Sequence, residues 1–403
     1  MNMTCDILVV GAGLAGMAAA LACAHKGASV TLLDNADPAA CLEEEFDGRA
    51  STIAARPFQM LRRLGIDERL GDRAEPITDI LVSDGELSTG VSPLTLHFDA
   101  DTVGSKALGY MMENRHLRRA LYEAVSDHPA VEYLAPVTVV DIKQTALSVS
   151  VELSDGRNLA ASLVVAADGR ESRVRQQAGI SVMKTSYRQK AIVTTVAHEH
   201  PHNGVAHELF LPPGPFAILP LSQNRSSIVW TDSPRAVDAA MALPEAAFAA
   251  ELARRFGNMY GTVEPCAPHR AYDLSLQLCE TYVDNRIALI GDAAHVIHPI
   301  AGQGLNMGFR DAAALADIVT EARATGQDPG IRIEQYGVRR KFDNFVMAAS
   351  TDILNRMFST DFAPLKYGRR LGLGLVEQIR PARQFFMREA AGQTGDLPSL
   401  FEA

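Results

Sequence analysis

The segment at residues 291–308, GDAAHVIHPIAGQGLNMG, carries one carboxylate and two imidazoles at spacings of three residues: Asp292, His295 and His298. On a regular helix, this spacing would place the three side chains on one face, where they could bind a metal ion. However, the segment also contains Pro299 and four glycines. Proline disfavours helical backbone at the residue before it, and glycines interrupt regular structure. The sequence therefore predicts a bent loop and a helix start, and no metal site.

Three glycines near the start of the chain are spaced as in a dinucleotide-binding turn. Gly11, Gly13 and Gly16 follow an apolar run at residues 6–10, which predicts a buried parallel strand. In such a turn, the first glycine permits the change from strand to helix and the second lets the backbone approach a pyrophosphate. The third lets the helix pack closely on the strand. The N–H groups that open the helix would then bind the phosphates.

The elements around this turn are those that a dinucleotide site requires. From Leu14 and Ala15 onward, the Ala-rich sequence predicts a helix, and residues 28–34 predict a second strand that ends on Asp34. An acidic residue at this distance from Gly11 accepts a hydrogen bond from a ribose hydroxyl. The pattern predicts dinucleotide binding but does not distinguish FAD from NAD.

The composition is that of a folded soluble protein. Of the 403 residues, 47% are hydrophobic and 21% are charged, and the net charge of −10 argues against a nucleic-acid partner. The five cysteines are scattered and form no CxxC motif, so we expect reduced thiols in a cytosolic protein. Residues 7–24 lack charge, but their clustered glycines and alanines favour a strand, a turn and a helix over a membrane span.

Two further motifs indicate which dinucleotide is bound. Residues 163–175, LVVAADGRESRVR, lead from an apolar strand into Asp168 and Gly169 and match the pattern DGxxSxxR. A second apolar strand, in RIALIGDAAH, ends at Gly291 and Asp292. Together with the glycine turn, these motifs resemble those of the FAD-dependent aromatic hydroxylases of the para-hydroxybenzoate hydroxylase type.

Other segments resemble, more narrowly, the hydroxylases of ubiquinone biosynthesis. One departure is Leu209 in AHELF, where many members of that family carry an arginine after the glutamate. The resemblance covers nearly the whole chain. The segments that carry it are residues 47–65, 108–121, 209–221, 226–231 and 369–400.

The motifs and the strand-like runs between them predict an α/β fold. A Rossmann-like FAD-binding domain with the GxGxxG turn would be interleaved with a mostly antiparallel substrate-binding β-sheet and followed by C-terminal helices. The predicted parts are an FAD-binding domain at residues 1–72, 106–183 and 284–332, a substrate-binding domain at 73–105 and 184–283, and a C-terminal helical region at 333–403.

The resemblance also implies roles for single residues. Asp292 would bind the ribityl chain of FAD, Arg49 its phosphates, and Asn114 the flavin. Pro299 would lie beside the oxygen-reactive carbon of the ring, and backbone N–H groups of the next turn would stabilise the reduced ring. The other predicted cofactor-binding residues are Gly11, Gly13, Leu14, Ala15, Gly16, Asp34, Asp168, Gly302, Gln303, Gly304 and Asn306.

Several of these residues have a second, structural interpretation. Arg49 could be an ordinary surface charge and Asn114 a helix cap. Asp168 could orient Arg49 or the backbone near the pyrophosphate. Asn306 could contact the ring or cap its helix. His295 is expected to pack or to hydrogen-bond locally.

By this resemblance, the chain is an FAD-dependent monooxygenase that hydroxylates a polyprenylated phenol in ubiquinone biosynthesis. NAD(P)H would bind transiently and reduce FAD, and O2 would form a flavin hydroperoxide that transfers oxygen to the ring. His298 and Pro299 are the predicted catalytic residues, and His298 and Tyr187 are the candidates for a base. Two alternatives stay open: a hydroxylase of a small soluble aromatic acid, and a non-catalytic FAD-binding subunit of a biosynthetic complex.

The C-terminal region contains a basic stretch. Between Lys366 and Ala390, one Lys and five Arg stand against two Glu, in a chain whose net charge is −10. This stretch would either pack on the acidic body or contact anionic lipid, where a polyprenylated substrate resides. We expect a cytoplasmic protein, with peripheral contact to the inner membrane as the second option. Other ubiquinone-biosynthesis proteins are further candidate partners.

Overall fold

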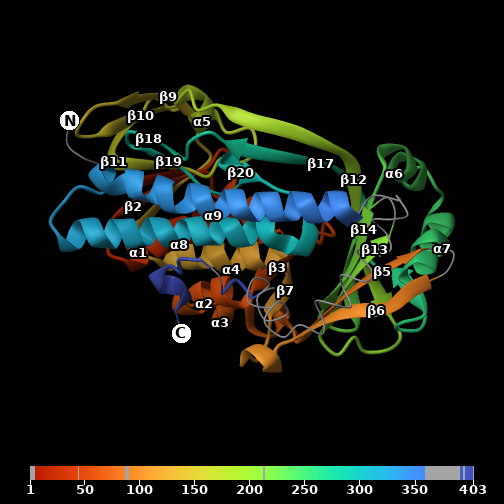
Figure 1. Cartoon of the computed structure of the whole chain (residues 1–403). Coiled ribbons are helices and arrows are strands. Elements are labelled where there is room, and N and C mark those ends of the chain that lie inside the picture. The colour runs from red at the N-terminus through yellow and green to blue at the C-terminus, as the bar shows by residue number, and fades with distance from the viewer. Residues whose placement is uncertain are drawn as a thin grey trace.

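Two large β-sheets, each covered by helices, dominate the structure (Figure 1). A computed structural model describes residues 5–43, 45–86, 90–211, 214–358, 391–393 and 395–402. The first sheet and the long helices α8 and α9 occupy one half of the molecule. The second sheet, with α6 and α7, occupies the other half (Figure 1). The predicted α/β architecture is confirmed.

The first sheet has a parallel centre, in the order β18-β19-β11-β1-β2-β8. The strands β1 and β11 are almost wholly buried, as a parallel strand in the middle of a sheet requires. The strand and helix predicted on either side of the glycine turn are confirmed. The strands are β1 (Cys5–Val10), β2 (Val30–Leu33), β8 (Val131–Leu134), β9 (Val139–Gln144), β10 (Val149–Leu153), β11 (Asn158–Ala166), β18 (Val283–Asp284) and β19 (Ile287–Leu289).

Small residues let the helices beside this sheet approach one another closely. The helix α1 (Leu14–His25) is rich in alanine and packs against α8 (Gln303–Ala324) and α4 (Asn114–Asp127). The helix α9 (Pro329–Phe358) lies alongside α8 (Figure 1). The basic stretch between residues 366 and 390 lies outside the described residues.

The second sheet is mostly antiparallel, as predicted, in the order β20-β17-β12-β15-β14-β13-β5-β6. Only the pairing of β13 with β5 is parallel among the described strands of this sheet. Its strands are β5 (Asp79–Glu86), β6 (Gly90–Asp99), β12 (Val182–His198), β13 (Val205–Leu211), β14 (Gly214–Leu221), β15 (Arg225–Asp232), β16 (Val263–Pro265), β17 (Arg270–Cys279) and β20 (His295–Val296).

One face of the second sheet is closed by α6 (Pro234–Met241) and α7 (Glu245–Phe256). Side chains alternate along β13, so Leu209 and Leu211 pack into the core under these helices. The alternate residues Glu208 and Phe210 point to the other face and line the cavity described below. That face is therefore the one available to a ligand.

A small third sheet lies between the two large ones and is tied to the second by buried charge. Glu113, at the end of β7, pairs with Arg115 at 2.6 Å and with Arg225 of β15 at 2.8 Å. The remaining elements are β3 (Ala50–Ala54), β4 (Glu75–Ile77), β7 (Gly109–Glu113), α2 (Ala55–Arg63), α3 (Ile66–Leu70), α5 (Arg173–Gln177), η1 (Pro38–Leu42), η2 (Gly71–Arg73), η3 (Asp101–Val103), η4 (Gly291–Ala293), η5 (Ile300–Gly302) and η6 (Ser399–Phe401).

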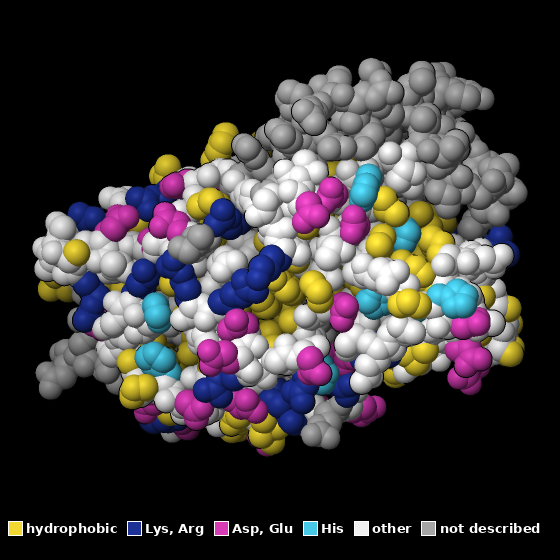
Figure 2. All heavy atoms as spheres, turned by 90° about the horizontal axis from the view of Figure 1, so that it is seen from below, with side chains coloured by type: hydrophobic (Ala, Val, Ile, Leu, Met, Phe, Trp, Pro, Cys, Tyr) yellow, Lys and Arg dark blue, Asp and Glu magenta, His cyan; other side chains and the backbone are white. Residues whose placement is uncertain are grey.

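The described surface mixes both signs of charge. On the face shown in Figure 2, Lys and Arg side chains lie among Asp and Glu side chains and form no broad basic field on the atoms drawn in colour. Within the described part of the chain, no helix combines the length and the apolar character needed to cross a membrane.

Candidate flavin and substrate site

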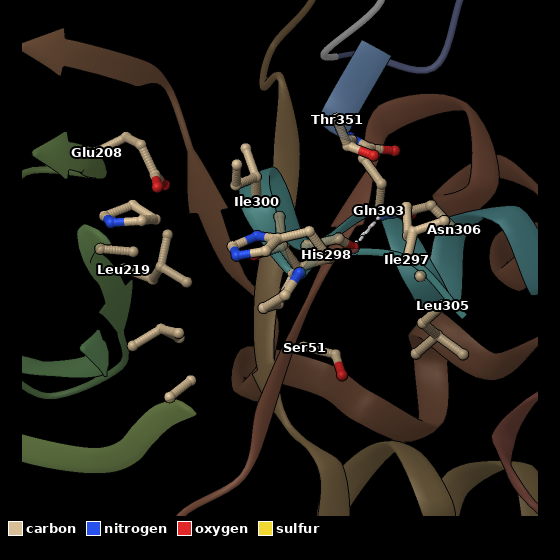
Figure 3. Close-up of a pocket in the computed structure, with 18 of the residues that line it drawn as sticks. Ser51, Glu208, Leu219, Ile297, His298, Ile300, Gln303, Leu305, Asn306 and Thr351 are labelled. Carbon is tan, nitrogen blue, oxygen red and sulfur yellow. Dashed lines mark hydrogen bonds between the residues drawn. The ribbon is translucent and has the colours of Figure 1, made fainter. Parts of the chain in front are cut away.

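A cavity of about 900 Å³ lies between the cofactor-type motifs and the second sheet. This volume falls in the range of sites for small molecules and cofactors. One wall holds the predicted residues Arg49, Asn114, Asp292 and Pro299, together with the turn at 302–306. The opposite wall is made by apolar side chains of β5, β6, β13 and β14 (Figure 3).

Glycine is required at two of the three positions of the first turn by the packing of the backbone, and at the third position it leaves space for a ligand. Gly11 has a φ of +104°, and a Cβ on it would lie 2.4 Å from the carbonyl oxygen of Ala167. A Cβ on Gly16 would lie 1.8 Å from the carbonyl oxygen of Gly11. A Cβ on Gly13 would meet nothing within 4 Å. The fold itself thus requires Gly11 and Gly16, whereas Gly13 borders open space that a ligand can approach.

Asp34 fastens this turn to the end of β2. Its Oδ2 accepts a hydrogen bond from the N–H of Ala12 at 2.5 Å, and its Oδ1 accepts one from the N–H of Ala36 at 2.7 Å. Leu14 and Ala15 lie in the first turn of α1, where backbone N–H groups have no partner within the helix. The carboxylate therefore orders the turn, and each oxygen keeps lone-pair capacity for a ligand hydroxyl.

Asp168 has a structural role that the sequence could only offer as an alternative. Its carboxylate accepts hydrogen bonds from Ser172 Oγ at 2.5 Å and from the N–H groups of Arg173 at 2.8 Å and Val174 at 3.2 Å. These bonds satisfy free donors at the start of α5. The buried Arg175 then donates to the carbonyl oxygen of Ala293 at 2.8 Å. The DGxxSxxR motif thereby joins the strand end at Asp168 to the segment that carries Asp292.

Arg49 and Asn114 lie together at the cavity wall. The N–H of Asn114 donates to the carbonyl oxygen of Arg49 at 3.0 Å, and Ser51 Oγ donates to Asn114 Oδ1 at 2.6 Å. Asn114 is the first residue of α4, and Glu113 holds the cap position, so Asn114 is not a helix cap. The guanidinium of Arg49 pairs with Asp47 at 2.6 Å and is half exposed.

The two histidines of the 291–308 segment do not share a helix, as predicted. His295 lies in β20, and His298 lies in irregular backbone before Pro299. Among the described residues, no group of three or more His, Cys, Asp or Glu side chains could hold a metal ion. Asp292 is exposed and lines the cavity.

His295 belongs to a buried charge cluster rather than to the cavity chemistry. Its Nε2 lies 2.6 Å from Oδ2 of Asp311, which also accepts a hydrogen bond from the N–H of Gly291 at 3.0 Å. The other oxygen of Asp311 accepts one from Arg340 Nε at 2.8 Å. Burial raises the pKa of Asp311, but His295 and Arg340 outweigh it and lower the pKa to about 2. This cluster fixes the backbone before and after Asp292 against α8 and α9.

His298 faces the cavity with both ring nitrogens unsatisfied by the described residues. The ring is buried and packs edge-on against Tyr187, with 5.0 Å between ring centroids. Burial lowers the pKa of His298 to about 4, so the imidazole is neutral near pH 7. A neutral ring with one free donor and one free acceptor suits a polar ligand (Figure 3).

The turn that opens α8 offers backbone to the cavity. A Cβ on Gly304 would meet nothing within 4 Å, and Gln303 lies beside it at the helix start. Gly302 has a φ of +62°. Asn306 accepts a hydrogen bond from the N–H of Ala54 and donates to the carbonyl oxygens of Thr52 and Gly302, each at 2.9 Å. Asn306 thus joins the turn to β3; its side chain accepts no hydrogen bond from the free N–H groups of α8, so it is not a helix cap.

Sequence reasoning missed Glu208, which β13 places in the cavity wall. Burial raises the pKa of this carboxyl to about 7. The sequence could have indicated this position. Ala206, Glu208 and Phe210 are spaced two residues apart in a strand, so they share one face of the sheet, and Glu208 is the acidic residue among apolar neighbours on that face.

Comparisons with known proteins show which family the chain belongs to. The model of a family described as "FAD binding domain" matches residues 4–346. Ubiquinone hydroxylase UbiL of Rhodospirillum rubrum is 47% identical over 96% of this chain and 89% of its own length. The 3-demethoxyubiquinol 3-hydroxylase of Escherichia coli is 35% identical, over 97% of this chain and 99% of its own.

The fold is also that of a solved structure, p-nitrophenol 4-monooxygenase PnpA from Pseudomonas putida DLL-E4. The TM-score is 0.79 at 19% identity, over 98% of this chain and 99% of that one. The family match and the two close relatives lead to one conclusion: this chain belongs to the FAD-dependent monooxygenase family that includes the ubiquinone hydroxylases.

Proposed function

We propose that this protein hydroxylates the ring of a polyprenylated phenol in ubiquinone biosynthesis, with FAD as cofactor and NAD(P)H and O2 as co-substrates. The observation that carries the proposal is the single cavity shared by the flavin-type motifs and an apolar sheet wall. The names of the relatives, a ubiquinone hydroxylase and a demethoxyubiquinol hydroxylase, support the substrate class.

The residues present fit FAD. Gly13 and Gly304 both border open space, so backbone N–H groups near them can approach a pyrophosphate and a ring system. Asp292 is exposed at the cavity, where a carboxylate can accept hydrogen bonds from the ribityl hydroxyls. Arg49 would reach the phosphates by exchanging Asp47 for them. Asn114, Gln303 and Pro299 would border the flavin.

FAD, when bound and reduced, would supply the activated oxygen for the ring. The chain's own task is then to position the phenol, to exclude water and to handle the hydroxyl proton. The apolar side chains of the second sheet exclude water from one side. The unsatisfied nitrogens of His298 provide a neutral hydrogen-bonding group on the other. Both proposed catalytic residues, His298 and Pro299, lie at the cavity.

The apolar wall favours a prenylated phenol over a small aromatic acid. A hydroxylase of an aromatic acid needs a cation on the substrate side of its pocket to bind the carboxylate. The cations that line the cavity within the described residues are Arg49 and Arg170, both from segments next to the cofactor-type motifs. The described side chains from β5, β6 and β14 that line it are all apolar: Ile80, Val82, Leu96, Phe98, Pro215, Ala217 and Leu219.

We also propose that the helix α9 brings the cavity to a membrane surface. Val338, Phe342, Phe345 and Ile353 follow helical spacing and are 74%, 70%, 59% and 62% exposed. Val346, next to this stripe, is both exposed and part of the cavity lining. A prenyl tail could therefore pass from a bilayer along α9 to the ring site.

Vesicle flotation tests this membrane contact. The triple variant Val338→Ser, Phe342→Ser, Phe345→Ser should lose binding to vesicles that contain anionic phospholipid. The control variant Leu147→Ser, which removes a 77% exposed leucine elsewhere, should keep it. Equal binding of both variants would remove α9 from the proposal.

The division into FAD-binding, substrate-binding and C-terminal parts at the predicted boundaries is also part of this proposal. It is supported by the two large sheets, whose strands come mainly from the predicted segments; the exception is β20 at residues 295–296, which joins the second sheet from a segment predicted for the FAD-binding domain.

Turnover by purified protein tests the proposed function. The FAD-loaded protein should oxidise NAD(P)H faster when a short-tailed prenyl phenol is added, and the phenol should gain a hydroxyl group. Faster turnover with a soluble aromatic acid would favour the first alternative. Bound FAD with no turnover on either class would favour a non-catalytic subunit.

A further inference from the structure

Glu208 occupies a distinctive position in the ligand-facing side of the second sheet. It lies directly opposite Val82 on β5 and Ala217 on β14, and Ala217 in turn lies opposite Val229 on β15. All four side chains line the cavity. One carboxylate therefore stands in a cross-strand row that is otherwise apolar.

This carboxylate has a raised pKa. Desolvation raises the pKa of Glu208 to about 7, and no hydrogen bond or charge of a described residue contributes to this shift. Its neighbour His207 is bonded through Nε2 to the hydroxyl of Tyr260 at 2.8 Å, and burial lowers the pKa of His207 to about 4. The Glu208 side chain is partly exposed toward the cavity and partly desolvated by the sheet around it, so a ligand group that enters the cavity can become its partner.

The other ionisable side chains that line the cavity do not account for the raised pKa of Glu208. His295 is engaged by Asp311. The strands β5 and β14, which flank Glu208, contribute no titratable side chain to the cavity among their described residues. The remaining ionisable lining residues are Arg49, Arg170, His207, Tyr272, Asp292 and His298. None of them shifts the pKa of Glu208, for which burial is the cause.

The Glu208 side chain points into the cavity. In Figure 3, the carboxylate of Glu208 points from its strand toward the side of the cavity on which Ile300 and His298 lie. Pro299, between these two residues in sequence, borders the proposed flavin position. A phenol ring placed between the two walls can thus direct its hydroxyl group at Glu208.

We propose that Glu208 is a catalytic residue that binds the phenol hydroxyl of the substrate and accepts its proton during ring hydroxylation; this rests on the function proposed above. The O–H bond of the phenol breaks, and its electron pair becomes the C=O bond of the ring. The displaced π electrons form the new carbon–oxygen bond to the outer oxygen of the activated O2 that reduced FAD would supply. The oxygen–oxygen bond breaks, and its electron pair leaves on the other oxygen atom, which ends as water. The hydroxylated carbon then loses its hydrogen as a proton, which restores the aromatic ring. The phenol proton forms an O–H bond on the carboxylate and is later released to water.

The alternative bases are less suited to this step. Burial raises the pKa of Tyr187 to about 12, so the tyrosine is protonated at neutral pH and cannot accept a proton. His298 is unprotonated, but its pKa of about 4 makes it a weak base. Glu208 titrates near neutral pH, which is where a general base is most effective. The hydroxyl proton becomes strongly acidic as oxygen adds to the ring, so a carboxylate can take it.

The test compares Glu208→Gln with Glu264→Gln, which makes the same change at an exposed position of β16 in the same sheet. At pH about 8, Glu208→Gln should lower kcat/KM for a short-tailed prenyl phenol by roughly 100-fold, within the range of general-base effects. The wild-type kcat/KM should rise through pH about 7, as the carboxylate ionises, and this rise should vanish in Glu208→Gln. Glu264→Gln should match the wild type.

A binding measurement provides a readout that does not depend on turnover. The oxidised, FAD-loaded protein is titrated at pH about 8 with the phenol and with its methyl ether, and the flavin absorbance is followed. The wild type should bind the phenol at least about 10-fold more tightly than the ether, as a hydrogen bond to a charged group predicts. Glu208→Gln should reduce that preference to a few-fold. Glu208→Asp, which keeps the charge, should keep the pH dependence.

A wild-type pH profile and a wild-type preference for the phenol in Glu208→Gln would overturn this assignment while leaving the proposed function intact. If Glu208→Gln fails to bind FAD, the Glu208→Asp variant is used instead. A Glu208→Asp protein whose kcat/KM no longer rises with pH would overturn the assignment. Absence of hydroxylation by the wild type would instead defeat the proposed function itself.

Discussion

Replacing Gly13 by alanine should separate the binding of FAD from the stability of the fold. Gly13 caps α1 with a φ of −68° and a ψ of 178°, which any residue can adopt, and its Cβ would meet nothing within 4 Å. Alanine is a poorer helix cap than glycine, but it restricts the unfolded chain more. These effects oppose one another, so the free energy of unfolding of the apoprotein should change by less than about 1 kcal/mol.

The affinity for FAD should change far more. The added methyl group would occupy the space through which a pyrophosphate approaches the first turn of α1. Losing one hydrogen bond to a charged group costs about 1.5–3 kcal/mol, which is a 10- to 150-fold weaker Kd. Quenching of flavin fluorescence measures the Kd, and urea unfolding followed by circular dichroism measures the stability of the apoprotein.

The matched variant Gly16→Ala should behave differently, because its Cβ would lie 1.8 Å from the carbonyl oxygen of Gly11. We expect this variant to lower the stability of the apoprotein as well as the affinity for FAD. A Gly13→Ala protein that binds FAD as tightly as the wild type would refute the placement of the pyrophosphate at this turn.

Three further outcomes follow from the site. Asp292→Ala should weaken FAD binding, measured by the flavin retained after gel filtration, while the melting temperature of the apoprotein should stay within a few degrees; full flavin content would contradict the proposed ribityl contact. Asp311→Asn should lower the free energy of unfolding by about 1.5–3 kcal/mol in urea, because Arg340 would lose the charged hydrogen bond to its fully buried partner and keep only the pair with the partly exposed Asp343; a loss below about 1 kcal/mol would contradict the cluster's role. Burial raises the pKa of Glu113, but hydrogen bonds from His116 and Arg115 and the charge of Arg225 outweigh it and lower the pKa to about 2. This stability is present above pH about 4.5 and is lost toward pH about 2, so acid should cost the wild type up to about 3 kcal/mol more than Glu113→Gln, and equal acid unfolding curves would argue against it.

Local sequence patterns predicted the parts of the site that are built from consecutive residues. The glycine turn after β1 and the strand ends at Asp168 and Asp292 each follow from a short apolar run and the residues directly after it. The proline and the glycines of the 291–308 segment correctly predicted that His295 and His298 do not share a helix.

The remainder depends on contacts between distant segments, which one sequence does not display. Asp34 and Asp168 were predicted as ligand-binding carboxylates, and the structure adds that both also accept hydrogen bonds from backbone N–H groups. His295 is held by Asp311 of α8, and that pairing depends on how α8 packs against β20. The position of Glu208 in a cavity wall could not be predicted from the sequence, because it depends on the pairing of β13 with β5 and β14, which places apolar side chains on either side of it.

The proposed function is tested most directly by following the origin of the new oxygen atom. The FAD-loaded protein is supplied with NAD(P)H, a short-tailed prenyl phenol and isotopically heavy dioxygen, and the product is examined by mass spectrometry. The cavity that joins the flavin-type motifs to an apolar wall predicts one heavy oxygen atom on the ring of each product molecule. Oxidation of NAD(P)H that yields only hydrogen peroxide, with the phenol unchanged, would contradict the account.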